Sequence, residues 1–142
     1  VSRMAKIAAS IDDVPLTTYR ADSIIVATAT GSTGYALSAS GPILHPVSKD
    51  ILVVPVAAHL GLRESLIIPS NSHITLTMLS DGPLMLGVDG FIDVELMTGN
   101  QIIIRLSPYV ARFLRARDSN QHYKMLTERL GLEKTGGEDD RP

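Results

Sequence analysis

The sequence predicts a mainly β protein: an antiparallel β-sandwich-like domain with a short helix after a Gly/Thr loop and a second helix near the C-terminus. Short apolar or alternating runs recur at close spacing, turn residues separate them, and only two segments break this rhythm. Antiparallel sandwiches and barrels show this spacing, whereas alternating β/α units place helical segments between their strands. We therefore expect strands throughout most of the chain.

Composition limits the classes of protein to which the chain can belong. Its 142 residues, 44% hydrophobic and 20% charged, fit one globular domain or two very small ones. A net charge of -2 gives no basic field for nucleic acid or acidic lipid. The absence of cysteine excludes disulfides, thiolate metal sites and cysteine nucleophiles. No apolar run reaches the roughly 18 residues that span a bilayer, and the start lacks a signal core, so we expect a cytoplasmic protein without membrane or nucleic-acid partners.

The first strands can be placed from their neighbours. Residues 6–11 and 14–19 flank Asp12-Asp13, which indicates a hairpin. Residues 23–28 form a continuous β-branched run, typical of a strand buried on both faces, and residues 51–54 have the same character. Further strands are expected at 66–68, 73–78, 84–88, 92–96 and 102–106, with turns at Gly82-Pro83, Asp89-Gly90 and Gly99-Asn100.

Two segments lack strand periodicity. Residues 31–40 are rich in Gly, Ser and Thr and end at Gly41-Pro42, which predicts a loop opening a short helix with a Ser or Thr cap. Residues 121–132 have helical spacing. We therefore expect one domain over 1–132 and a disordered polar tail over 133–142.

The densest group of small polar residues runs from Thr28 to Tyr35, between a predicted strand and a predicted helix. Free backbone N–H groups at such a junction attract an anion or the polar edge of a ligand. An ordinary N-cap turn, in which Thr30 or Ser32 satisfies the first amides, explains the same residues. The cluster matches neither a Walker A loop nor a GxGxxG motif, so the pattern leaves both interpretations open.

Other polar residues give weaker signals. Asp22 directly precedes the buried strand, where it can lie close to the loop and accept from a ligand amide or ribose hydroxyl; a solvated aspartate is the common alternative. Asp89-Gly90 favours an ordinary hairpin turn. His45 and His59 have no triad partner or metal spacing, so we predict no catalytic residue and no metal ligand. The basic residues of the C-terminal third indicate a solvated face or a subunit contact.

Residues 21–46 read ADSIIVATATGSTGYALSASGPILHP and closely resemble the C-terminal domain of bacterial NAD kinases. That family carries the pattern D-G, apolar strand, T-P-T-G-S-T-A-Y, then S-A-G-G-P-I and H-P. The resemblance continues through residues 55–59 and 66–69 to the turn at 88–91, where Phe91 replaces the family's usual Gln. Ser23, Ala29 and Gly34 replace Gly, Pro and Ala, and these changes keep the residues small.

The resemblance implies an activity for a longer protein. NAD kinases transfer the γ-phosphoryl of ATP, or of polyphosphate in some members, to the adenosine 2′-hydroxyl of NAD, giving NADP with a divalent metal such as Mg²⁺. The family's N-terminal α/β domain, with its G-G-D-G and Asn-Glu motifs, has no counterpart in these residues. On this reading the chain is an excised C-terminal domain that is inactive alone and needs its N-terminal domain as a partner.

The resemblance also implies roles for particular residues. Asp22 would bind the nicotinamide–ribose half of NAD or NADP. The adenosine side would be lined by five residues of the loop and helix: Thr30, Thr33, Gly34, Tyr35 and Ser38. Family sites are built at a subunit contact, so a homo-oligomer, dimer or tetramer, is expected.

Three alternatives stay open beside this reading. The chain can be a nucleotide-sensing β domain without chemistry, a domain like those of the diacylglycerol and sphingosine kinases, or a purely structural module. The Thr-Gly-Ser-Thr-Gly-Tyr run argues against the lipid kinases, which differ there.

Overall fold

The computed structural model describes residues 4–114 and 121–132. The chain divides into two compact units, the first ending at Pro108 and the second beginning at Tyr109, and each is described by itself. The predicted tail at 133–142 lies outside the described residues. The domain limits expected from the sequence stay a prediction.

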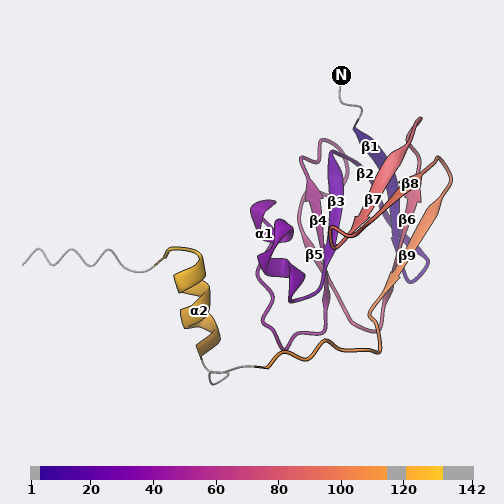
Figure 1. Ribbon diagram of the computed structural model, residues 1–142. Coiled ribbons are helices and arrows are strands. Elements are labelled where there is room, and N and C mark those ends of the chain that lie inside the picture. Colours follow the sequence, from indigo (N-terminus) through magenta and orange to yellow (C-terminus); the bar gives the residue numbers. More distant parts are fainter. Residues whose placement is uncertain (1–3, 115–120, 133–142) are drawn as a thin grey trace, which may run out of the picture. The chain divides into compact units, whose positions relative to one another are not determined.

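A four-stranded antiparallel sheet forms one layer of the first unit (Figure 1). Its strands are β1 (Ala5–Ile11), β2 (Val14–Ala21), β6 (His73–Met78) and β9 (Gln101–Arg105), in the order β2-β1-β6-β9. The hairpin predicted at Asp12-Asp13 is confirmed: both residues have positive φ, 49° and 65°, as a tight turn with right-handed strand twist requires.

A three-stranded antiparallel sheet forms the second layer. It contains β3 (Ser23–Ala27), β4 (Ile51–Val56) and β5 (Leu66–Ile68), with β4 in the middle. The prediction that residues 51–54 are buried on both faces is confirmed, since all four are buried. The same prediction is wrong for residues 23–28, because β3 is an edge strand and this position leaves each of its residues partly exposed.

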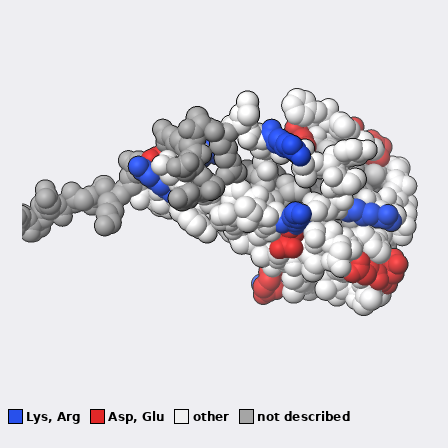
Figure 2. Space-filling view, turned by 90° about the horizontal axis from the view of Figure 1, so that it is seen from below, with Lys and Arg blue, Asp and Glu red and all other residues white. Residues whose placement is uncertain are grey.

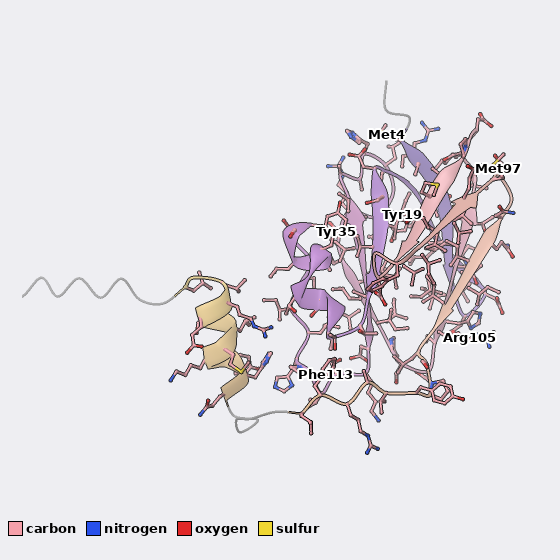
Figure 3. The ribbon with its side chains drawn as sticks, in the orientation of Figure 1. Met4, Tyr19, Tyr35, Met97, Arg105 and Phe113 are labelled. Carbon is pink, nitrogen blue, oxygen red and sulfur yellow. The ribbon has the colours of Figure 1, made fainter. Side chains whose placement is uncertain are left out.

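The main core lies between the two sheets. Alternate residues of β1 and β6 point inward and meet Ile51 and Val53 of β4. Tyr19 of β2 is completely buried in this core (Figure 3). The sequence prediction of a mainly β, sandwich-like antiparallel fold is therefore confirmed.

A second, smaller core covers the opposite face of β4. Leu52 and Val54 pack there against Ala29, Ala36 and Leu44. The segment that follows β3, comprising η1 (Gly31–Thr33) and α1 (Tyr35–Ser38), is thereby attached to the outside of the sandwich (Figure 1). A Cβ on Gly41 would lie 2.7 Å from Val54 Cγ2, so only glycine permits this close packing.

A separate hairpin joins β7 (Leu84–Val88) and β8 (Ile92–Leu96). Leu84 and Leu96 at its base pack against the main core. At its tip Asp89 and Gly90 have φ of 50° and 72°, which confirms the predicted hairpin turn. Six apolar side chains of the hairpin and its end stay exposed, and we call them the hairpin apolar surface: Met85, Val88, Phe91, Ile92, Val94 and Met97.

The second unit contains one described helix, α2 (His122–Arg129). The sequence predicted it over 121–132, and Gly131 follows it with a positive φ of 64°, a common way for a helix to end. Among residues 4–114 and 121–132, no helix has the length and apolar character needed to cross a bilayer.

Candidate functional site

The Gly/Thr loop, residues 28–35, folds as two tight turns directly after β3. The Ser32 N–H donates to Thr28 O at 2.9 Å, and the Gly34 N–H donates to Gly31 O at 3.0 Å. One turn of helix follows, closed by the Ala39 N–H on Tyr35 O at 3.0 Å. The predicted loop opening a short helix is confirmed.

The predicted side-chain cap is wrong. Neither η1 nor α1 has a hydrogen bond from the side chain of its N-cap residue to a backbone N–H of its first turn. Ser32 instead points inward, where its Oγ donates to Ala29 O at 2.6 Å and accepts from the Leu44 N–H at 3.0 Å. The side chain is fully buried, so Ser32 fixes the loop against the segment that returns from α1 and is not available to a ligand.

Ser32 points into the protein, whereas the other polar residues of the loop and of α1 lie at the surface. Thr30, Gly34, Tyr35 and Ser38 are exposed, and Thr33 is partly buried. The Thr33 hydroxyl donates to Thr30 O at 3.3 Å, which leaves its lone pairs free to accept.

Tyr35 and Ser38 are three residues apart on α1, so they share one side of the helix, while Ala36 faces the core. Tyr35 is 67% exposed, and Figure 3 shows it at α1. An exposed aromatic ring beside hydroxyl groups can stack on a flat ring and hydrogen-bond its polar edge. The structure thus brings five of the six predicted residues together.

Asp22 lies at the other end of β3. It is exposed at the corner where the chain passes from β2 to β3, and its N–H donates to Val56 O at 3.0 Å. The chain from Asp22 to Thr28 is largely extended, and its six residue steps separate the aspartate from the start of the loop by roughly 20 Å. The expectation that Asp22 lies close to the loop is therefore wrong; the extended strand holds them apart.

His45, His59 and His73 take part in contacts that stabilise turns and strand ends. His45 Nδ1 accepts from the Val47 N–H at 3.3 Å within a turn, and the backbone of His59 donates to Arg20 O at 2.8 Å. His73 lies between two aspartates, with its Nδ1 3.2 Å from Asp12 and its Nε2 3.2 Å from Asp13. In the described part of the chain no three His, Asp or Glu side chains form a group that could hold a metal ion.

Two groups with shifted pKa values lie outside the loop. The pKa of the Asp12 carboxyl is lowered, mainly by the backbone N–H of His73, with help from Ser72 and the charge of His73. The pKa of the Tyr19 hydroxyl is raised by burial. Both groups belong to the frame of the sandwich, so we assign neither to ligand binding.

A surface hollow of about 630 Å³ lies away from all six predicted residues, and no motif in the sequence indicates it. Its basic residues are Lys6 and Arg20, from β1 and β2. Side chains along each of these strands point alternately toward the core and toward solvent. This alternation is the one sequence signal that indicates that Lys6 and Arg20 both face outward.

Charges are otherwise mixed. On the face that Figure 2 shows, the described Lys and Arg side chains form separate patches among acidic and uncharged ones. On this face the described residues form no clustered basic stripe of the kind by which a nucleic-acid-binding surface is recognised.

Comparison with known proteins gives a consistent result. The family model for the ATP-NAD kinase C-terminal domain matches residues 1–116. A protein of Chloroflexus aggregans called NAD kinase is 45% identical over 130 residues, covering 92% of this chain and 47% of that protein. An NAD kinase of Dehalococcoides mccartyi is 41% identical over 130 residues, covering 92% of this chain and 46% of its own. The chain thus spans about half the length of these relatives.

Solved structures agree. A yeast NADH kinase in complex with NADH has a TM-score of 0.79 and 27% identity, covering 94% of this chain and 41% of that one. An NAD kinase from Archaeoglobus fulgidus in complex with ATP has a TM-score of 0.77 and 26% identity, covering 92% and 49%. The fold of this chain is therefore found inside larger nucleotide-binding enzymes.

Proposed function

The chain belongs to the ATP-NAD kinase C-terminal domain family, and from this membership we propose that it supplies the dinucleotide-binding wall of an NAD kinase. The reaction would move the γ-phosphoryl of ATP, or of polyphosphate, to the adenosine 2′-hydroxyl of NAD and produce NADP. The single observation that carries the proposal is the outward polar face of the Gly/Thr loop, held in shape by buried Ser32.

The predicted site residues lie at the two ends of β3, and this arrangement fits a dinucleotide, which has two nucleotide halves. We assign Thr30, Thr33, Gly34, Tyr35 and Ser38 to the adenosine side, where Tyr35 offers a ring and its neighbours offer hydroxyls. We assign Asp22 to the nicotinamide–ribose half. The separation of roughly 20 Å between Asp22 and the loop suits an extended dinucleotide lying along the strand better than a compact ligand.

We infer that part of the chemistry comes from residues other than those described. Among residues 4–114 and 121–132, no three His, Asp or Glu side chains form a group that could by itself hold the divalent metal expected for phosphoryl transfer. Phosphoryl transfer depends on positioning and charge stabilisation. We therefore propose that this chain positions NAD, while the phosphoryl donor and its metal are held by a complementary N-terminal half.

Self-association is part of the proposal. The hairpin apolar surface includes Phe91, which is 93% exposed, and burial of such side chains between copies would stabilise a dimer or tetramer. The cytoplasmic location expected from the sequence stays a prediction.

Thermal unfolding with and without NAD tests the proposed binding. A ligand that binds only the folded state, at ten times its Kd, stabilises by about 1.4 kcal/mol, a shift of a few degrees for a chain of this size. We expect NAD at millimolar concentration to raise the Tm more than ATP does. Tyr35→Ala should abolish the NAD effect. Tyr123→Ala is the matched control, because Tyr123 on α2 is 66% exposed, close to the value for Tyr35.

Two results would count against the proposal. If Tyr35→Ala and Tyr123→Ala respond to NAD like the unchanged chain, Tyr35 does not contact the ligand. If the chain responds to ATP and not to NAD, the loop is a nucleotide site of a different kind, as a nucleotide-sensing domain would have.

A further inference from the structure

The strand β9 forms one open edge of the four-stranded sheet. The order β2-β1-β6-β9 gives β9 one neighbour, β6, and among residues 4–114 and 121–132 no strand pairs with its other side (Figure 1). An antiparallel strand directs the backbone N–H and C=O groups of alternate residues to its two sides. The groups on the open side of β9 are therefore available to pair with a further strand.

The hydrogen bonds around β6 identify the residues of β9 that carry these groups. Directly before β9, Asn100 O accepts from the Met78 N–H at 2.9 Å, so the Asn100 carbonyl faces β6. Alternation then directs the backbone groups of Gln101, Ile103 and Arg105 away from β6, and those of the two isoleucines between them toward it. Within the described part of the chain, no hydrogen bond reaches the outward groups.

The two edges of this sheet differ in their protection against pairing. In β2, at the opposite edge, Pro15 lacks an N–H, and the register with β1 shifts between Ala9 and Ser10. β9 reads Gln-Ile-Ile-Ile-Arg, contains neither Pro nor Gly, and pairs with β6 without a register shift. Because β-branched residues favour extended strands, β9 is the regular edge to which another strand can be added.

The side chains of β9 separate into two faces. Ile102 and Ile104 are partly buried and pack against the main core, whereas Gln101, Ile103 and Arg105 are exposed. Ile103, in the middle of the strand, is 57% exposed. Figure 3 shows Arg105, the one charged residue of β9, at the end of the strand. An apolar centre between a neutral amide and a cation matches a copy of itself that runs in the opposite direction.

We propose that β9 pairs with β9 of a second copy of this chain, antiparallel, about a two-fold axis at Ile103. Ile103 then faces Ile103 of the second copy, and Gln101 faces Arg105 at both ends of the contact, so no like charges meet. Each facing pair exchanges two hydrogen bonds, because these residues direct their backbone groups to the open side. The four-stranded sheets of the two copies become one continuous sheet.

Other pairings of the same strand fit less well. A parallel arrangement would bring the two copies of Arg105 close together, and like charges on neighbouring strands are destabilising. An antiparallel shift by one residue would place the core-facing isoleucines of one copy beside outward side chains of the other. The charge and the alternation of β9 therefore favour a second copy of this chain, in one orientation and one register.

This contact is separate from the self-association proposed for the hairpin apolar surface, because β9 contributes no residue to that surface. The inference does not rest on NAD binding either, since none of the six predicted site residues lies on β9. Two different two-fold contacts on one chain would build a tetramer, whereas one of them alone builds a dimer.

Sedimentation velocity of the Phe91→Asp variant, in which the hairpin contact is weakened, tests β9 by itself. We expect this variant to form a dimer whose fraction rises between micromolar and millimolar concentration. Adding Ile103→Lys should raise the Kd of the dimer about tenfold or more, because two ammonium groups then face each other at the axis. The matched control adds Ile67→Lys, the same change at an isoleucine that is 51% exposed on β5, and should change the Kd by less than about twofold.

A mixture of opposite charges tests the axis and also shows that the variants are folded. In the same background, Ile103→Glu should weaken the dimer as Ile103→Lys does. An equimolar mixture of the two variants should form the dimer again, because an ammonium group then faces a carboxylate. A Phe91→Asp variant that stays monomeric, or equal effects of Ile103→Lys and Ile67→Lys, would overturn the pairing of β9 with a second copy. A mixture that stays monomeric would overturn the axis at Ile103.

Discussion

Single residues decide how the Gly/Thr loop is shaped and what it offers to a ligand. Ser32 looks like its neighbours in the sequence, yet it is buried while Thr30 and Tyr35 are exposed. Its hydroxyl serves two backbone groups, Ala29 O and the Leu44 N–H. Ser32 cannot contact a ligand, because it is buried, and its hydrogen bonds keep the exposed residues of the loop in position.

Replacing Ser32 with Ala should lower the free energy of unfolding by about 1–3 kcal/mol, because the buried Leu44 N–H loses its acceptor. Urea unfolding measures the change. The control is Ser38→Ala on exposed α1, expected within about 0.5 kcal/mol of the unchanged chain. Equal effects of the two substitutions would contradict the structural role given to Ser32.

Tyr19 presents the opposite case, a buried polar atom without a partner. Its Oη meets no hydrogen-bond partner among the described residues. Tyr19→Phe should leave stability at neutral pH unchanged or raise it by up to about 1 kcal/mol, since an unsatisfied hydroxyl is removed.

The pH dependence of the same variant has a definite sign. Burial raises the pKa of Tyr19 in the folded chain above that of the unfolded chain. The unfolded chain therefore loses this proton first, and the contribution of Tyr19 to stability is lost as the pH rises above about 10. Thermal unfolding between neutral and alkaline pH should show a smaller loss for Tyr19→Phe; parallel curves would contradict the burial effect.

At the level of elements, the turns between neighbouring strands could be predicted from the sequence, whereas the pairing of strands that are distant in the sequence could not. The hairpin at Asp12-Asp13 and the turn at Asp89-Gly90 follow from turn chemistry within a few residues. The order β2-β1-β6-β9 joins segments about sixty residues apart, and no local pattern specifies which strands become neighbours.

The candidate site was predicted in part for the same reason. Five of its residues lie in one continuous segment, so the sequence groups them correctly. The partner of Ser32 is twelve residues away, and the placement of Asp22 depends on the full length of an extended strand. Lys6 and Arg20 become neighbours only through the register of β1 and β2, which no motif encodes.

The β1–β2 hairpin is attached to β6 by Asp12, and this contact should depend on pH. The Asp12 carboxylate accepts from the His73 N–H at 2.9 Å, and this bond is the main reason that its pKa is lowered. A carboxyl whose folded pKa is lowered stabilises above its unfolded pKa, about 4, and loses that contribution as the pH falls through the folded value.

Asp12→Asn keeps an acceptor oxygen and tolerates the positive φ of 49°, so it removes only the charge. We expect a lower Tm than that of the unchanged chain at neutral pH, and convergence of the two values as the pH falls through the lowered folded pKa of Asp12. Asp13→Asn tests the neighbouring carboxylate, which lies on the other ring nitrogen of His73. A constant difference across the whole pH range would show that the charge of Asp12 is not responsible.

At the scale of the whole molecule, the hairpin apolar surface predicts self-association. Phe91 at its tip is 93% exposed, and Asp at this position would place a charge in any apolar contact. In sedimentation velocity, we expect Phe91→Asp to shift the chain toward the monomer, with Leu60→Asp as a control at an exposed apolar residue outside the hairpin. A monomeric unchanged chain, or equal shifts in both variants, would contradict an interface on the hairpin.

The central claim is that NAD lies along β3 between Asp22 and the outward face of the Gly/Thr loop. Amide chemical-shift mapping of the chain during a titration with NAD tests it most directly, because the method detects weak binding and locates it. We predict saturable shifts clustered at residues 30–38 and at Asp22, lost for the loop residues in Tyr35→Ala. Shifts confined to other segments, or no saturable shifts in a folded chain with NAD in the millimolar range, would contradict the account.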